Sequence, residues 1–268
     1  MSYYSGKNIL ISGAASGIGK LMAMEMGKLG GNMLLLDIDA LGLKSLKNEL
    51  DEKNIHSKSF TCDLSNRQNI YATAQQIEEV DILVNNAGIV TGKNILDAQD
   101  EMIEKTFQVN ILAHFWLVKS FLPGMIERDS GHIVTIASAG GLVATPRMTD
   151  YCSSKFAAVG FDESLRLELK KMGSSVLTTI VCPFFIDTEM FTGAKTRFSF
   201  LLPILKKDYV VNRIIKAVSR KKRRLIMPRF IYTIFPLRLL PFAGQDAFLD
   251  FFGVNKSMDE FVGKGENV

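Results

Sequence analysis

Two residues one helical turn apart carry the clearest chemical signal in this sequence. Tyr151 and Lys155 are four positions apart in a stretch with helical spacing, which places both side chains on one face. A free phenol has a pKa of about 10, too high for a base at neutral pH. A nearby ammonium favours the phenolate, and lowering the pKa to about 7 takes roughly 4 kcal/mol, within reach of several such interactions in a shielded site. The pair therefore predicts general acid–base catalysis in which Tyr151 exchanges a proton with an alcohol oxygen.

A serine is expected close to this pair. Ser138 directly follows residues 132–137, an apolar run that is typical of a buried strand. Ligands bind at the carboxyl edge of open parallel sheets, so the Ser138 hydroxyl is placed to hold a substrate oxygen. Ser and Lys mostly lie on protein surfaces, so neither residue alone indicates a catalytic site, and only their occurrence together does.

A glycine-rich segment, Ser-Gly-Ala-Ala-Ser-Gly-Ile-Gly at 12–19, follows the first predicted strand. Glycine lets the backbone turn tightly and approach a pyrophosphate, and the helix that follows offers free N–H groups and a positive dipole end. The segment predicts a dinucleotide site made by Gly13, Ser16, Gly17, Ile18 and Gly19.

An acidic residue ends the second predicted strand. The Asp37 carboxylate can accept both ribose hydroxyls of an adenosine and would repel a 2′-phosphate, and neither Ile38 nor Asp39 could neutralise such a phosphate. The sequence therefore favours NAD over NADP, with Asp37 and Ile38 at the ribose. The alternative role for Asp37 is a helix N-cap, which Asp39 could fill just as well.

Strand and helix patterns alternate along the chain, which predicts one doubly wound parallel sheet of about seven strands, a Rossmann fold. We expect one domain over residues 1–228. Residues 229–268, rich in Phe, Leu and Pro without clean periodicity, are expected as an extension packed on or beside it. The predicted strands are 8–12, 32–37, 58–62, 81–85, 132–137, 176–182 and 225–227, and the predicted helices are 18–29, 40–53, 66–79, 98–128, 150–172 and 210–220.

These motifs occur in an order that resembles the short-chain dehydrogenase/reductase family: the glycine-rich segment, Asn-Asn-Ala-Gly at 85–88, Asn110, Ser138, and Tyr151 with Lys155. The resemblance extends to about residue 188. It implies an enzyme that moves a hydride between NAD and an alcohol or carbonyl carbon. It further implies that Asn110 positions a water beside Lys155, and that helices 98–128 and 150–172 pair in a homodimer or tetramer.

The resemblance also implies cofactor contacts beyond the glycine-rich segment. One departure concerns Phe184, which stands where the family usually has glycine. Besides Tyr151 and Lys155, the implied contacts are Asp63 and Leu64 at the adenine, Asn86, Ala87 and Gly88 in the cofactor cleft, and Pro183, Ile186 and Thr188 at the nicotinamide.

The residues expected around the substrate are mostly apolar, which favours a hydrophobic alcohol or ketone, although several would serve equally well as core. Stretches 110–116, 151–161, 181–186 and 201–205 resemble the branch of retinol dehydrogenases and 17β-hydroxysteroid dehydrogenases, which implies a retinoid, steroid or other lipid alcohol. The alternatives are a carbonyl or 3-oxoacyl reductase and a non-catalytic NAD-binding protein at a membrane. The expected substrate residues are Ser138, Leu142, Met148, Tyr151, Phe184, Phe185 and Met190.

Positive charge is concentrated in one part of the chain. Residues 195–229 hold twelve Lys and Arg and one Asp, whereas the whole chain is only +4. The tract is either a solvated face or, with the apolar residues after it, a peripheral membrane contact through 195–242. No nucleic-acid recognition motif accompanies it.

The sequence shows neither a signal peptide nor an apolar run long enough to span a membrane, so we expect a cytoplasmic protein. With only three cysteines and three histidines, the sequence predicts no metal site.

Overall fold

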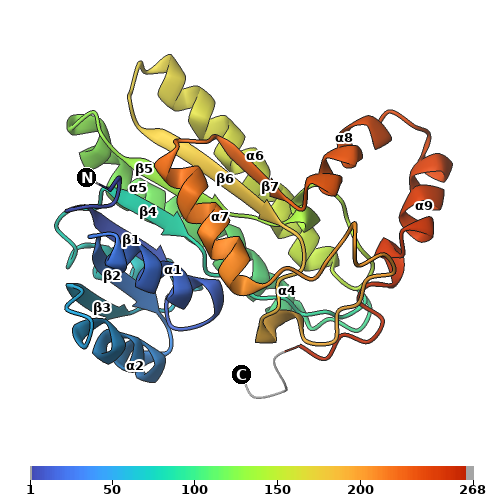
Figure 1. Ribbon diagram of the computed structural model, residues 1–268, viewed down its shortest axis with the longest axis horizontal. Helices are drawn as coiled ribbons and strands as arrows, with labels where there is room; N and C mark the ends of the chain where they lie inside the picture. Colours follow the sequence, from blue (N-terminus) through green and yellow to red (C-terminus); the bar gives the residue numbers. More distant parts are fainter. Residues whose placement is uncertain (1, 264–268) are drawn as a thin grey trace.

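The computed structural model describes residues 2–263 and contains one parallel seven-stranded sheet in the order β3-β2-β1-β4-β5-β6-β7 (Figure 1). This confirms the predicted doubly wound fold, and each strand begins and ends within one residue of its predicted bounds. The chain reverses direction across the sheet between β1 and β4, the point where such folds bind ligands. The strands are β1 Asn8–Ser12, β2 Asn32–Asp37, β3 Ser57–Thr61, β4 Ile82–Asn85, β5 His132–Ile136, β6 Leu177–Pro183 and β7 Arg224–Met227.

Both faces of the sheet are covered, which is why most of its strands read as continuous apolar runs. Ile9 and Ile11 belong to the core under α1 (Gly17–Lys28), α2 (Ala40–Asp51) and α7 (Lys207–Ser219). Leu10, between them, points into a second core under α3 (Arg67–Ala74), α5 (Ala113–Glu127) and α6 (Thr149–Lys171).

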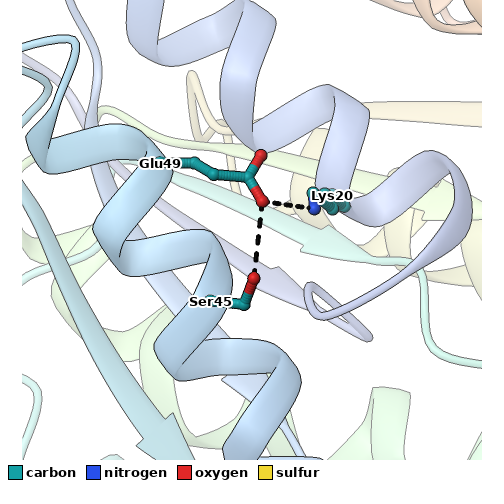
Figure 2. Close-up of polar contacts among 3 residues, drawn as sticks. All are labelled: Lys20, Ser45 and Glu49. Carbon is teal, nitrogen blue, oxygen red and sulfur yellow. Dashed lines mark hydrogen bonds and ion pairs between the residues drawn. The ribbon is translucent and has the colours of Figure 1, made fainter.

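The two helices nearest the glycine-rich segment are joined by a polar contact. The Lys20 ammonium on α1 donates to Glu49 Oε1 on α2 at 2.7 Å, and the Ser45 hydroxyl approaches the same oxygen at 3.5 Å (Figure 2). The Lys20 and Glu49 side chains are about one-third exposed, so the pair stabilises the fold by at most about 1 kcal/mol. It fixes how α2 lies beside α1.

The predicted helix 98–128 is not a single regular helix. It consists of α4 (Asp100–Phe107), a π-helical turn, η1 (Gln108–Leu112), and α5. A π turn holds one more residue than an α turn, which a 3.6-residue pattern does not reveal, and such turns are frequent at functional sites.

The same stretch, Asp100–Glu127, is the one helical segment within residues 2–263 that is long and apolar enough to cross a membrane. Half of its most apolar window is buried inside the protein. It packs against α3, β4 and α6, so its apolar composition reflects its place in the core.

Two other helices differ from their predicted lengths. The helix predicted at 66–79 ends at Ala74, because the chain turns after it and buries Ile77 and Val80 ahead of β4. The helix predicted at 210–220 begins three residues earlier, at Lys207.

The extension after residue 228 forms short helices beside the carboxyl ends of β6 and β7 (Figure 1). Each is too short to give a sequence periodicity, which explains why none was predicted. They are η4 (Arg229–Thr233), α8 (Ile234–Leu237), α9 (Phe242–Phe251) and η5 (Val254–Lys256).

Candidate active site

Tyr151 and Lys155 lie on the first turns of α6, facing the carboxyl edge of the sheet. Both are buried, and the Lys155 ammonium is 5.6 Å from the centre of the Tyr151 ring. The Lys155 Nζ donates to the carbonyl oxygen of Ile136, at the end of β5, at 3.0 Å. The helical spacing thus brings the phenol and the ammonium together at the end of β5.

Burial controls the ionisation of both groups. It raises the pKa of the Tyr151 phenol well above its usual value, and a hydrogen bond with Ser138 opposes that shift. Burial also lowers the pKa of Lys155 to about 8, opposed by the nearby Cys182. At neutral pH the lysine therefore still carries its ammonium, while the phenol of the free protein holds its proton.

Ser138 is the residue before a single turn of 3₁₀ helix, η2 (Ala139–Gly141), which follows β5. Its hydroxyl oxygen accepts the Gly140 N–H at 3.0 Å, and the hydroxyl lies 3.5 Å from the carbonyl oxygen of Pro183 at the end of β6. The structure therefore places Ser138 between two strand ends and next to Tyr151.

Asn110 lies within the π turn and is fully buried. Its amide oxygen accepts the Ile89 N–H at 2.8 Å, and its amide nitrogen donates to the Ile89 carbonyl at 2.9 Å and to the Ser154 hydroxyl at 3.0 Å. A methyl group built on Gly88 would lie 3.4 Å from both the Asn110 amide oxygen and Lys155 Nζ. Asn110 thus joins α6 to the loop after β4, with Gly88 fitting closely between Asn110 and Lys155.

The glycine-rich segment turns tightly between β1 and α1. Gly13 and Gly17 have positive φ values of 67° and 56°, which favour glycine. A Cβ on Gly13 would lie 2.8 Å from Ala87 Cα, and one on Gly19 would lie 2.0 Å from the Gly13 carbonyl oxygen. A Cβ on Gly17 would instead meet no atom within 4 Å. The segment is therefore closely packed at Gly13 and Gly19 and open at Gly17. Helix α1 begins at Gly17, directly after Ser16, and Ile18 lies in its first turn.

Asp37 faces this segment from the end of β2. One carboxylate oxygen accepts the Ala15 N–H at 2.9 Å and the other accepts the Asp39 N–H at 3.0 Å. Asp39 provides the N-cap of α2 by accepting the Gly42 N–H at 2.9 Å. The capping role thus belongs to Asp39, and the Asp37 carboxylate, followed by an exposed Ile38, lies beside the glycine-rich segment.

The loop after β4 is bonded to the same segment. The Asn86 side-chain amide donates to the carbonyl oxygens of Ser12 and Gly13 at 2.9 and 3.0 Å. The Ser12 hydroxyl in turn accepts the N–H groups of Asn86 and Ala87. The Asn86 side chain therefore supports the loop, and its backbone and Ala87 remain at the edge of the cleft.

The other expected cofactor residues follow β3 and β6 at the same edge. Asp63 accepts two hydrogen bonds from Ser65, and Leu64 is buried. Ile186 pairs with Leu205 in an isolated parallel bridge, and Thr188 lies two residues beyond it, whereas Pro183 ends β6.

Phe184 fits the position that glycine usually holds in the family. It is absent from the residues with positive φ in the described chain, and its N–H donates to the Met227 carbonyl at 2.8 Å. A backbone without a positive φ therefore accommodates the phenylalanine.

A cavity of about 620 Å³, counting its open mouth, lies beside Ser138 and Met148. Its wall is almost entirely apolar. Three expected substrate residues, Leu142, Tyr151 and Met190, do not contribute to it, although the Tyr151 ring packs on Phe191, which does. The Leu142 carbonyl instead accepts a hydrogen bond from Arg238. The cavity is lined by Ser138, Ala139, Gly140, Val143, Thr145, Met148, Phe184, Phe185, Phe191, Leu202, Phe230, Ile231, Thr233, Ile234, Phe248, Phe252 and Val254.

The C-terminal part of that wall was not anticipated from the sequence. Phe230 packs against Phe252 with ring centres 4.9 Å apart, and Phe252 against Phe248 at 4.5 Å. The four-residue spacing of Phe248 and Phe252, which puts both rings on one side of a helix, is the signal that could have found them.

Residues 253–263, here called the C-terminal strap, contact three loops at the carboxyl edge. The Arg147 guanidinium, ahead of α6, donates to the carbonyl oxygens of Met258 and Asp259, both at 2.8 Å. The Val262 N–H donates to the Thr192 carbonyl after β6. A Cβ on Gly92, after β4, would lie 2.0 Å from the Phe261 ring. The end of the chain therefore helps to position the loops around the cavity.

The residues present fit a nicotinamide dinucleotide. The open Gly17 and the start of α1 suit the phosphates, and the Asp37 carboxylate suits a ribose. Lys155 lies beside Tyr151, whose ring packs on the cavity residue Phe191, and it also lies close to Gly88 in the loop after β4.

Comparisons with known proteins agree with this arrangement. The short chain dehydrogenase family matches residues 7–197. The chain is 42% identical to epidermal retinol dehydrogenase 2 of Mus musculus, over 97% of this chain and 86% of the relative. It is 39% identical to retinol dehydrogenase 10 of Homo sapiens, over 96% and 85%. A solved short chain dehydrogenase/reductase from Burkholderia phymatum, in complex with NAD, superposes with a TM-score of 0.79 at 26% identity, covering 93% of this chain and 97% of that one. The chain therefore belongs to the short-chain dehydrogenase/reductase family of oxidoreductases, in the branch that contains these retinol dehydrogenases.

Proposed function

We propose that this oxidoreductase transfers a hydride between NAD(H) and the CH–OH or C=O group of a retinoid, a steroid or another lipid alcohol. One observation carries the proposal: the Tyr151 ring, next to the Lys155 ammonium, packs on Phe191, which lines a cavity whose wall is apolar apart from Ser138 and two threonines. The names of the retinol dehydrogenase relatives support the same substrate class.

Each polar residue at this junction has a defined task. A bound nicotinamide would supply the hydride acceptor or donor. The Ser138 hydroxyl holds the substrate oxygen, and Tyr151 removes its proton on oxidation or returns one on reduction. The Lys155 ammonium favours the phenolate, which the buried phenol does not form unaided. Asn110 holds the loop after β4 against α6, which keeps Lys155 in place.

We propose NAD rather than NADP as the cofactor. The Asp37 carboxylate lies against the glycine-rich segment, where it can bind ribose hydroxyls and would repel a 2′-phosphate. Asp63, Leu64, Ile186 and Thr188 are proposed contacts further along the cofactor. The remaining proposed contacts are Gly13, Ser16, Gly17, Ile18, Gly19, Ile38, Asn86, Ala87, Gly88, Tyr151, Lys155 and Pro183.

A substrate screen tests both proposals together. NADH absorbance is followed with retinols, hydroxysteroids and long-chain alcohols, with NAD or NADP, and in the reverse direction with the matching ketones and aldehydes. We expect the highest kcat/KM for a lipophilic alcohol with NAD. Faster turnover of small polar alcohols would contradict the substrate class, and a preference for NADP would contradict the role of Asp37.

We further propose a cytoplasmic protein that touches a membrane peripherally through its basic residues 195–242 and assembles as a homo-oligomer. Three buried free thiols fit a reducing compartment. Exposed apolar residues on the π turn, α5 and α6, namely Leu112, Phe115 and Leu167, support pairing through these helices. Light scattering after gel filtration would give twice or four times the chain mass, and a monomer would contradict the pairing.

A further inference from the structure

The turn between α8 and α9, residues 238–242, exposes large apolar side chains; we call it the α8–α9 tip. Leu239 is 86% exposed, Phe242 82% and Leu240 49%. The helix that follows, α9, has no buried residue although it contains three phenylalanines and a leucine. Single exposed apolar residues are normal on protein surfaces, but a contiguous group with this much exposure marks a contact surface.

Basic residues predominate in the segment that leads to the tip. Residues 220–242 hold seven Arg and Lys and no acidic residue. The Arg224 guanidinium, which also pairs with Glu163 on α6, lies 5.9 Å from the ring of Phe235 on α8. The ring of Phe235 is exposed, and so is that of Tyr232, which lies 6.1 Å from it. Apolar side chains bordered by aromatic rings and cations suit the boundary between lipid headgroups and acyl chains of an anionic membrane.

The inner side of the same segment is the wall of the cavity. Phe230 and Ile234 line it from η4 and α8, and Phe248 and Phe252 from α9 and the residue after it. The rings of Phe230 and Phe248 are stacked with centres 6.4 Å apart, so aromatic contacts hold η4 against α9 at this point. The tip and the cavity therefore lie on opposite sides of one thin layer of short helices.

We propose that the α8–α9 tip inserts into an anionic lipid surface, and that a lipophilic substrate passes from that surface between η4 and α9 into the cavity. This inference rests on the proposed function, since only a lipophilic substrate resides in lipid. The depth of insertion is limited by Asp246 and Asp250, two exposed carboxylates on α9, so that the tip enters the membrane and most of α9 stays outside.

The test compares a double variant, Leu239→Ser with Phe242→Ser, against Leu41→Ser. Leu41 is 80% exposed on α2, away from the cavity, and is the matched control. Flotation uses phosphatidylcholine vesicles with and without phosphatidylserine. We expect wild type and Leu41→Ser to float with the anionic vesicles, and the tip variant to bind them about tenfold or more weakly, since it loses two large apolar side chains. Equal flotation of all three proteins would overturn the insertion.

Turnover separates the substrate route from the chemistry. The tip variant should match wild type on a short-chain alcohol dissolved in water but lose about tenfold in kcat/KM on a retinol embedded in anionic vesicles. Equal rates on the embedded retinol would overturn the route. Failure of wild type on both alcohols would overturn the proposed function, while flotation would still decide the insertion. If gel filtration instead shows a dimer that the tip variant abolishes, the surface belongs to a second copy and the membrane assignment is wrong.

Discussion

The two halves of the carboxyl edge differ in how they are held. Around β1, β2 and β4, side-chain hydrogen bonds fix the glycine-rich segment: Asp37 accepts from Ala15, and Asn86 donates to Ser12 and Gly13. Around β5, β6 and β7, apolar side chains from separate parts of the chain enclose the cavity. We call the part around β1, β2 and β4 the cofactor half, because directional hydrogen bonds suit a ligand of fixed shape. We call the part around β5, β6 and β7 the substrate half or apolar half, because non-directional apolar contacts suit a site that must admit a lipid.

The boundary between the halves is α6, which carries the phenol and the ammonium. A change at this boundary should abolish chemistry and leave both halves able to bind. Changes within one half should weaken binding of one ligand only.

The largest effect is expected at the boundary, from Tyr151→Phe. The variant loses the oxygen that we propose transfers the proton but keeps the ring packed on Phe191. We expect kcat to fall by about 10³-fold, within the range for removal of a general acid or base. NADH absorbance measures turnover, and calorimetric titration with NAD should give an unchanged Kd. Substantial remaining activity would contradict the role of Tyr151.

A buried carboxyl on α6, which does not line the cavity and has Glu163, Arg166 and Arg224 near it, is an exception to this division. Asp162 lies on α6 near β6 and is 3% exposed, and its Oδ1 has no hydrogen-bond partner among the described residues. Burial raises its pKa to about 7, opposed by Arg166 and Arg224. Between about pH 4 and pH 7 the folded chain thus keeps a proton that the unfolded chain has lost, so stability falls as pH rises through this window.

Asp162→Asn tests this exception. The amide cannot ionise, so the variant should be more stable than wild type at pH 8, by up to about 4 kcal/mol, and should lose the decline between pH 4 and pH 7. Urea unfolding across this pH range measures both. Asp246→Asn, at an exposed carboxylate, is the matched control and should keep the decline. If wild type and Asp162→Asn instead lose stability in parallel as the pH rises, another group is responsible.

The difference between the halves also explains what the sequence could predict. The cofactor half depends on residues close together in the chain, such as Gly13, Gly17 and Gly19, whose types follow from local backbone geometry. Most of the strands were predicted because their buried apolar runs are continuous. The π turn at Asn110 was missed because one inserted residue leaves no mark in an apolar pattern.

The substrate half was predicted less well because its wall forms only when the end of the chain folds back. Ser138, Met148, Phe184 and Phe185 were expected and do line the cavity, but Leu142, Tyr151 and Met190 do not. The aromatic residues that the C-terminal extension adds lie far along the chain from Ser138, and no local pattern connects them to it. Apart from the four-residue spacing of Phe248 and Phe252, the short helices that position them show no clear periodicity.

A matched pair of variants tests ligand binding by each half separately. Asp37→Ala should raise the KM for NAD by about 10- to 100-fold, the effect of losing charged hydrogen bonds, and leave the KM for the alcohol unchanged. Phe248→Ala should raise the KM for a lipophilic alcohol about tenfold through lost apolar contact and leave the KM for NAD unchanged. Steady-state kinetics with each ligand varied in turn would show this crossover, and equal changes in both KM values would mean that the halves are coupled.

The smallest effect is expected where the C-terminal strap meets Arg147. Arg147 has a φ of 63°, in the left-handed region that disfavours a residue with a side chain by about 1 kcal/mol, and its guanidinium donates to Met258 and Asp259. Arg147→Ala loses the hydrogen bonds and keeps the unfavourable backbone, whereas Arg147→Gly loses both. The glycine variant should therefore be the more stable of the two by about 1 kcal/mol in thermal or urea unfolding.

Both variants should nonetheless raise the KM for a lipophilic alcohol by about threefold to tenfold, because loss of about 1 kcal/mol of strap contact loosens the loops around the cavity. The KM for NAD should not change, since the strap contacts the loops after β4 and β6 and the turn before α6, not the glycine-rich segment. The strap would then act on the substrate half alone. If the two variants differ in stability but share the wild-type KM for the alcohol, the strap stabilises the fold without shaping the cavity, and the apolar half depends only on its aromatic contacts.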